Sequence, residues 1–220
     1  MKSFKNIVLS FDLDNTLINN KEGIVNSFNY ALKQYKIPEM NKNKIERMIG
    51  IPLDEMFQKI SNLSPKLLST SFREYYGKIG IFQANLIPGI KEKLKDLKKK
   101  SFVMGIITSK KVEMAIRITK YLEIFEFFDY IIGESEKIRS KLDPYLPKLL
   151  NNKYPGYKII IIGDHPKDRA LAENLNAPFI GVLTGHHTAK ELLSNIKVKN
   201  LILPSVKDLT AENIFSLLEN

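Results

Sequence analysis

The most informative stretch of this chain lies near its N-terminus and reads Ile7-Val8-Leu9-Ser10-Phe11-Asp12-Leu13-Asp14-Asn15-Thr16-Leu17. Its first half is an apolar run rich in β-branched residues, which predicts a buried strand. Two carboxylates, Asp12 and Asp14, follow where the strand is expected to end. Burying acidic side chains at the end of a buried strand costs free energy unless a metal ion or cations neutralise them. A polar turn containing Asp and Asn is the plainer interpretation of this stretch taken alone.

The composition is that of a globular protein with a substantial core. The chain has 220 residues, of which 44% are hydrophobic and 26% charged, and no run of 18 apolar residues predicts a transmembrane helix. The apolar run that begins at Ile7 is cut at Asp12, which is too early for a signal peptide. The sequence contains no cysteine, so disulfides and thiolate metal sites are excluded. We therefore expect a cytoplasmic protein without a membrane partner.

The net charge of +10 raises the question of nucleic-acid binding. The lysines are spread along the chain, and the densest cluster, within residues 91–100, has Leu94 and Leu97 at helical spacing between them. This pattern is typical of a solvated helix face, so nucleic acid is not the expected partner. A basic surface also attracts small phosphorylated anions, and the charge alone does not distinguish the two ligands.

Apolar strands alternate with helices in the second half of the chain. Strands are predicted at 102–107, 130–133, 158–162, 178–183 and 201–203, and helices at 89–99, 111–121, 141–150, 167–175, 188–195 and 210–218. Because each strand is continuously apolar, the pattern indicates an α/β fold with a parallel sheet covered on both faces. Between residues 20 and 82 the pattern instead predicts about four helices, at 22–36, 41–49, 53–61 and from Ser64-Pro65 through Tyr76.

Polar side chains gather at one edge of the predicted sheet, because the carboxyl ends of parallel strands meet there and bind ligands. They are Asp12, Asp14, Thr108, Ser109, Asp164 and Asp168, with Lys141 before a helix that should start at the same edge. Each has a plain alternative: Thr108, Ser109 or Asp164 could cap the helix that follows, and Lys141 alone would be a surface lysine. Their joint position on one edge favours a site.

The chemistry of these side chains fits phosphoryl transfer. Three carboxylates near one point suit a hard cation with oxygen ligands, such as Mg²⁺. Mg²⁺ and Lys141 supply the positive charge that phosphoryl oxygens need, and a hydroxyl and backbone N–H groups before helix 111–121 hold the remaining oxygens. One carboxylate in line with the phosphorus serves as nucleophile and forms an acyl phosphate. A second protonates the leaving oxygen and later activates water.

The same residues resemble, in order, the four motifs of the haloacid dehalogenase superfamily. They are Asp12-Leu13-Asp14-Asn15-Thr16, Thr108 after an apolar strand, Lys141-x-x-Pro144 and Gly163-Asp164-x-x-x-Asp168. The helical insertion resembles the small cap of the phosphoglycolate phosphatase and β-phosphoglucomutase branch. The resemblance implies a Rossmann-like, three-layer α/β core of residues 1–19 and 83–220, with a helical cap domain of residues 20–82. The hinges between them are expected around 19–21 and 80–86.

The resemblance also implies a role for each matching residue. Asp12 would be the nucleophile and a metal ligand, Asp14 the general acid/base and a metal ligand through its main-chain carbonyl, and Asp164 a further metal ligand. Asp168 would support the metal indirectly, and Thr16 would support the loop that carries both acids. Thr108, Ser109 and Lys141 would bind the phosphoryl group, and Lys141 would also neutralise the nucleophile.

The sequence departs from the family pattern in places that matter. Asn15 stands where relatives often have Gly, although Asn also tolerates left-handed backbone. Leu142 follows Lys141 where Pro is usual, so Lys137 and Arg139 compete for the cationic role. Phosphoglycolate phosphatases often carry an acidic residue just after the first motif, where this chain has Asn at positions 19 and 20.

We expect a Mg²⁺-dependent phosphatase that hydrolyses a small phosphorylated metabolite, as a monomer or homodimer. Dehalogenation is not expected, because dehalogenases of the superfamily lack the second acid, Asp14. Two alternatives stay open: a phosphomutase in which Arg47 binds a second phosphate, and a non-catalytic protein that binds anions or nucleic acid on the same fold. Substrate selection is expected from Arg47 and the Gly50-Ile51 turn.

The three histidines do not form a metal-binding pattern. His165 is expected as a loop residue, with contact to the substrate as the alternative. His186 and His187 are expected in a loop at the edge of the site.

Overall fold

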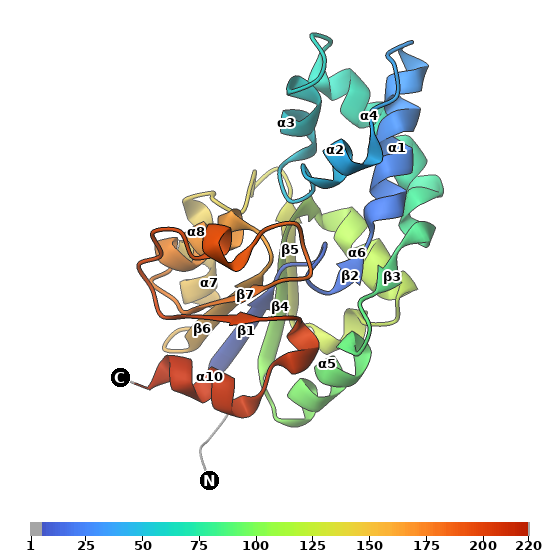
Figure 1. Cartoon of the computed structure of the whole chain (residues 1–220). Coiled ribbons are helices and arrows are strands. Elements are labelled where there is room, and N and C mark those ends of the chain that lie inside the picture. Colours follow the sequence, from blue (N-terminus) through green and yellow to red (C-terminus); the bar gives the residue numbers. More distant parts are fainter. Residues whose placement is uncertain (1–5, 220) are drawn as a thin grey trace.

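The computed structural model describes residues 6–219; residues 1–5 and 220, at the ends of the predicted core, lie outside the described residues. A six-stranded sheet forms the core, in the order β5-β4-β1-β6-β7-β8, and every neighbouring pair is parallel (Figure 1). The strands are β1 (Ile7–Phe11), β4 (Val103–Lys111), β5 (Tyr130–Glu134), β6 (Lys158–Gly163), β7 (Phe179–Val182) and β8 (Asn200–Leu203). The predicted α/β fold with a parallel sheet is confirmed.

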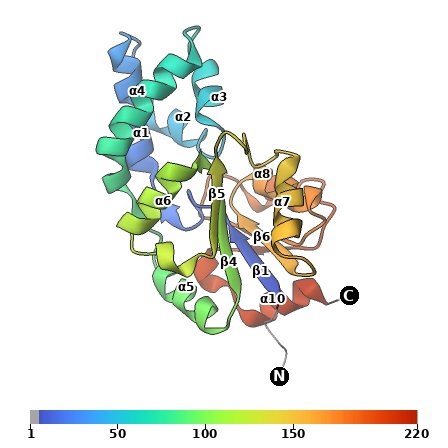
Figure 2. The same ribbon diagram turned by 180° about the vertical axis from the view of Figure 1, so that it is seen from behind.

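Helices cover both faces of the sheet, as Figures 1 and 2 show. They are α5 (Ile90–Lys99), α6 (Val112–Tyr121), α7 (Tyr145–Lys153), α8 (Pro166–Asn174), α9 (Ala189–Leu192) and α10 (Ala211–Leu218). Successive residues of a strand point to opposite faces: Ile160 and Ile162 pack with α5, α6 and α10, whereas Ile159 and Ile161 pack with α7, α8 and α9. This double burial is why the strands are continuously apolar.

A helical lobe of four helices stands beyond the carboxyl edge of the sheet (Figure 1). The helices are α1 (Lys21–Gln34), α2 (Lys42–Glu46), α3 (Leu53–Gln58) and α4 (Pro65–Lys78), so the predicted helical insertion is present. Aromatic stacking holds the lobe together: the Phe28 and Phe57 rings lie 4.3 Å apart, and the Phe72 and Tyr76 rings 5.6 Å apart. These rings belong to a single apolar cluster that continues from the lobe into the main core.

The two crossings between the core and the helical lobe run side by side. Strand β2 (Ile18–Asn19) pairs antiparallel with β3 (Asn85–Leu86) in a separate two-stranded sheet. The tract 18–22 is polar and turn-like in sequence, but the structure places residues 18 and 19 in β2 and residues 21 and 22 in α1. Strands of two residues are too short to show an alternating pattern in the sequence.

The lysine-rich segment forms α5, which buries Ile90, Leu94 and Leu97 and thereby confirms the predicted amphipathic helix. Within residues 6–219, no helix combines the length and the apolar character needed to cross a bilayer.

Candidate active site

Three aspartates meet at the carboxyl edge of the sheet. Asp12 follows β1, Asp164 follows the neighbouring strand β6, and Asp168 lies in the first turn of α8. One carboxylate oxygen of each lies within 4.8 Å of the others, and all three residues are buried. We call these three residues the acid cluster.

Lys141 reaches into the acid cluster from the loop before α7. Its Nζ lies 2.7 Å from Asp12 Oδ1 and 2.6 Å from Asp168 Oδ1, and only 1% of its side chain is exposed. Lys137 and Arg139, the two competing cations, are both exposed. The structure therefore places Lys141, and neither competitor, beside the acids.

The acid cluster carries more negative charge than its protein partners neutralise. Burial raises the pKa of Asp12 to about 7 and the pKa of Asp164 well above its ordinary value. Burial alone would lower the pKa of Lys141, but the attraction of Asp12 and Asp168 outweighs it and raises that pKa. One ammonium does not balance three buried carboxylates, and a divalent cation would neutralise the remaining negative charge. The all-oxygen donor set fits Mg²⁺. The residues present thus fit the metal that the sequence predicts.

Local backbone geometry sets the orientation of the acids. Asn15 adopts the left-handed conformation, with φ of 57°, at the turn where relatives often have Gly. Thr16, one residue on, donates a hydrogen bond from Oγ1 to Asp164 Oδ1 at 3.1 Å. Asp168 Oδ2 accepts the backbone N–H of His165 at 3.1 Å, within a capping box. Hydrogen bonds therefore hold the carboxylates of Asp164 and Asp168, and Lys141 holds that of Asp12.

Helix capping does not explain the polar residues at this edge. His165 is the N-cap of α8 and its Nδ1 accepts the backbone N–H of Lys167 at 3.0 Å, so Asp164 is left free of that task. The N-cap of α6 is Lys111, with no side-chain cap, so neither Thr108 nor Ser109 caps that helix. His165 was expected in a loop, and it stands at the end of the loop before α8, where its side chain caps the helix.

The second acid of the first motif, Asp14, faces a different set of partners. Its carboxylate lies 3.0 Å from Lys110 Nζ and accepts a hydrogen bond from Asn20 Nδ2 at 3.1 Å. Asn20 also donates to the Tyr76 hydroxyl at 2.6 Å, and Lys110 Nζ stands 4.8 Å from the centre of the Tyr76 ring. Asp14 is thus tied to the start of α1 and to α4, the two longest helices of the lobe.

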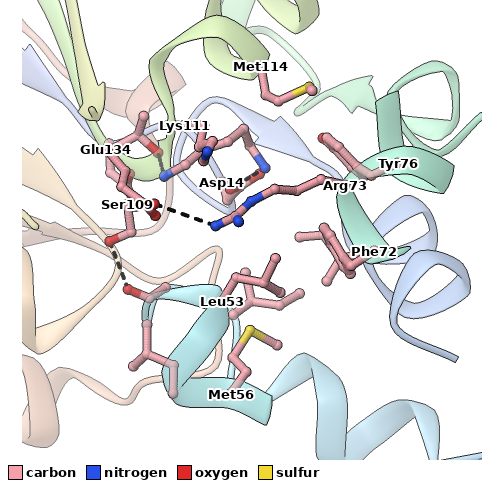
Figure 3. A pocket seen from close by; sticks show the side chains of 17 residues that line it. Asp14, Leu53, Met56, Phe72, Arg73, Tyr76, Ser109, Lys111, Met114 and Glu134 are labelled. Atoms are coloured by element: carbon pink, nitrogen blue, oxygen red, sulfur yellow. Dashed lines mark hydrogen bonds and ion pairs between the residues drawn. The ribbon is translucent and has the colours of Figure 1, made fainter. Parts of the chain in front are cut away.

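A pocket lies between the acid cluster and the helical lobe (Figure 3). Asp12, Asp14 and Thr108 line its base, and side chains of α1, α3, α4 and α6 form its walls. Arg73 of α4 extends into it, as Figure 3 shows. Arg47, the expected substrate-binding residue, is exposed and is not among the residues that line this pocket.

Several residues of the pocket were not identified from the sequence, above all Arg73, Lys110 and Tyr76. Tyr76 is a buried residue of α4 and was noted only as part of the fourth predicted helix. Lys110 stands two residues beyond Thr108, in a run of polar residues that gives no sign of which one turns inward. Arg73 is one of 34 basic residues and shows no distinguishing pattern.

The helical lobe rests directly on the core in this structure. Ser109 Oγ donates to the carbonyl of Gly50 at 3.1 Å, and Arg73 Nη2 lies 3.4 Å from Glu134 Oε1. Gly50 has φ of 105°, and a Cβ there would stand 2.7 Å from the His165 ring, so the close approach of this turn requires glycine. Lys167 also forms an ion pair with Glu55 at 3.6 Å, and His186 Nε2 lies 3.9 Å from Glu46 Oε2.

Comparison with known proteins assigns the class. A family model described as haloacid dehalogenase-like hydrolase matches residues 9–182, which contain the acid cluster, Lys141 and the helical lobe. The chain belongs to this family of hydrolases.

Two solved structures and one curated protein illustrate the relationship. A haloacid dehalogenase-like hydrolase from Streptococcus pneumoniae has a TM-score of 0.82 at 28% identity, covering 96% of this chain and 98% of that one. A predicted phosphatase from Clostridium acetobutylicum has the same TM-score, 0.82, at 29% identity and covers 96% and 99%. Pyrophosphatase PpaX of Bacillus cereus is 29% identical over 74% of this chain and 77% of its own length.

Proposed function

We propose that this hydrolase is a Mg²⁺-dependent phosphomonoesterase, which cleaves a small phosphorylated metabolite through an aspartyl-phosphate intermediate on Asp12. One observation carries the proposal: Lys141 bridges Asp12 and Asp168 at 2.7 and 2.6 Å inside a buried cluster that opens onto a pocket. Lys141 holds the Oδ1 atom of Asp12, and Asp12 also lines the pocket in which a substrate would bind.

In the first step, a carboxylate oxygen of Asp12 attacks the phosphorus, and the bond from phosphorus to the leaving oxygen breaks. Asp14 gives its proton to that leaving oxygen. In the second step, Asp14 takes a proton from a water molecule, which attacks the phosphorus and releases inorganic phosphate from Asp12. Lys141 and the Thr108 hydroxyl hold the phosphoryl oxygens throughout.

Asp12 and Asp164 would hold Mg²⁺ through their carboxylates, with the main-chain carbonyl of Asp14 as a third ligand. Bound there, the ion supplies positive charge to the phosphoryl group and offsets the repulsion among the acids. Thr16 orients Asp164 for this role through its 3.1 Å hydrogen bond. Asp168 holds Lys141 and the start of α8, which agrees with an indirect part in metal binding.

We further propose that residues 20–82 act as a cap that opens for exchange and closes for the reaction. The paired strands β2 and β3 support hinges at the two crossings, and the contacts of Ser109 with Gly50 and of Arg73 with Glu134 describe the closed arrangement. No observation favours a phosphomutase, because the exposed Arg47 does not line the pocket where a second phosphate would have to sit.

The proposal is tested by measuring phosphate release from a panel of phosphorylated metabolites and inorganic pyrophosphate, with Mg²⁺ and with EDTA. We expect turnover of at least one phosphomonoester that EDTA abolishes and excess Mg²⁺ restores. The Asp12→Asn variant in the same assay controls for contaminating phosphatases. Absence of turnover across the panel, or equal turnover by Asp12→Asn, would refute the proposal.

A further inference from the structure

The pocket changes character with distance from the acid cluster. Its base carries the reacting groups, whereas more than half of the side chains in the walls beyond Asp14 are apolar, and Figure 3 labels several of them. The apolar side chains come from the α2–α3 turn, α3, α4 and α6: Ile49, Leu53, Met56, Phe72 and Met114. In the proposed reaction the phosphoryl group occupies the base of the pocket. The leaving group, whose oxygen Asp14 protonates, must therefore occupy the space between these walls.

Two of the three cations that line the pocket are already paired with acidic side chains. Lys110 Nζ lies 3.0 Å from Asp14, and Arg73 Nη2 lies 3.4 Å from Glu134. An anionic leaving group would have to displace Glu134 from Arg73, and it would face the repulsion of the Glu134 carboxylate. It would also lie against apolar side chains that cannot hydrogen-bond with it.

Lys111 is the remaining cation among the lining residues, and it stands at the rim. It lines this pocket and also the neighbouring groove formed by residues 111–113 and 134–137. A cation shared with that open groove attracts phosphorylated substrates toward the site, but it lies at the edge of the space for the leaving group.

We infer that the preferred substrates are phosphomonoesters whose leaving group carries an apolar body, an alkyl chain or a ring, instead of a carboxylate or a second phosphate. The inference rests on the proposed function and adds the substrate class. Leucine, methionine and phenylalanine side chains around a few fixed polar groups are the usual lining for such a body, and the two methionines adapt to its shape.

The first test is kcat/KM, with Mg²⁺, for a series of n-alkyl phosphates from ethyl to hexyl. The leaving alcohols have similar acidity, so the series isolates contacts with the pocket from the chemistry of the leaving oxygen. Each added methylene that the pocket buries should raise kcat/KM roughly fourfold, the ratio that corresponds to the burial of one methylene. Butyl phosphate should therefore exceed ethyl phosphate by at least about tenfold.

Phosphoglycolate and inorganic pyrophosphate, measured in parallel, separate the inference from the function on which it rests. If either anionic substrate exceeds butyl phosphate, or if the alkyl series is flat, the apolar leaving group is refuted while the phosphatase stands. If no substrate is turned over, the proposed function fails, and the inference fails with it.

A variant ties the preference to the pocket. Leu53 is half-buried and lines the pocket from α3, so Leu53→Asn should lower the ratio of kcat/KM for butyl over ethyl phosphate by about fourfold or more. The control is Leu67→Asn, at a leucine of α4 that is 50% exposed and outside the pocket, which should keep the ratio. The ratio does not depend on the fraction of folded protein, so a loss of stability alone would not move it. An unchanged ratio in Leu53→Asn would overturn the assignment.

Discussion

The acid cluster in the core and the pocket walls in the helical lobe handle charge in opposite ways. In the acid cluster, three buried carboxylates share a single lysine, and burial raises the pKa of Asp12 to about 7. In the walls, Arg73 pairs with Glu134 and most other side chains are apolar. The unbalanced region is suited to bind a cation and a phosphoryl group, whereas the balanced region is suited to a neutral body. The proposed site of reaction and the proposed site of substrate selection are therefore separated in space.

The largest effect is expected from Asp12→Asn in the acid cluster. The amide cannot form an acyl phosphate, so kcat should fall by about 10³-fold or more. The melting temperature should be kept, because Lys141 retains Asp168 as a partner and one buried carboxylate is removed. Phosphate release and thermal unfolding of the same preparation measure both; near-normal turnover of p-nitrophenyl phosphate would show that Asp12 is not the nucleophile.

Lys141→Met should reduce both activity and stability. It leaves the three acids without their cation, and the loss of one partner from a buried ion pair typically costs about 3–5 kcal/mol of unfolding free energy. Chemical denaturation in EDTA measures this cost. Lys137→Met is the matched control at an exposed lysine four residues away, and it should change the unfolding free energy by less than about 0.5 kcal/mol. Equal effects of the two variants would contradict the central position of Lys141.

Mg²⁺ should stabilise the folded protein through the same cluster. At a concentration of 100 times its Kd, a ligand that binds only the native state adds about 2.7 kcal/mol to the unfolding free energy. For a chain of this size that corresponds to a rise in Tm of roughly 5–10 °C. Differential scanning calorimetry with and without Mg²⁺ measures the shift, and Asp164→Asn should remove most of it. A full shift in Asp164→Asn would exclude this residue as a ligand.

The smallest effect is expected from the two arginines of the helical lobe. Arg73→Met removes the ion pair between α4 and Glu134, and a partly exposed pair contributes at most about 1 kcal/mol. Since that contact joins the lobe to the core, kcat/KM should fall up to about fivefold. Arg47→Met, at the exposed arginine, should change kcat/KM by less than about twofold on the same substrate. A larger loss in Arg47→Met would restore the substrate-binding role first expected for it.

Much of the core could be predicted because its strands produce sequence patterns that are visible within a few neighbouring residues. A strand buried on both faces must be continuously apolar, so β1, β4 and β6 are visible as uninterrupted runs. A parallel sheet brings the carboxyl ends of its strands together. From this rule alone, Asp12 and Asp164 were expected at one point, and the structure places them within 4.8 Å. The choice of Lys141 over Lys137 and Arg139 was not settled by the sequence, because a loop has no periodicity to show which cation turns inward.

Local sequence patterns were thus sufficient to predict the α/β class, the helical insertion and the order of the acids along one edge. How the lobe meets the core depends instead on long-range packing. The pairing of β2 with β3, the contact of Arg73 with Glu134 and the ion pair of Lys110 with Asp14 join segments by long-range packing. Such contacts leave no local pattern, because the sequence around each residue does not indicate which distant residue it meets. The acid cluster follows from the strand ends, and the pocket walls follow from the packing of the helical lobe on the core.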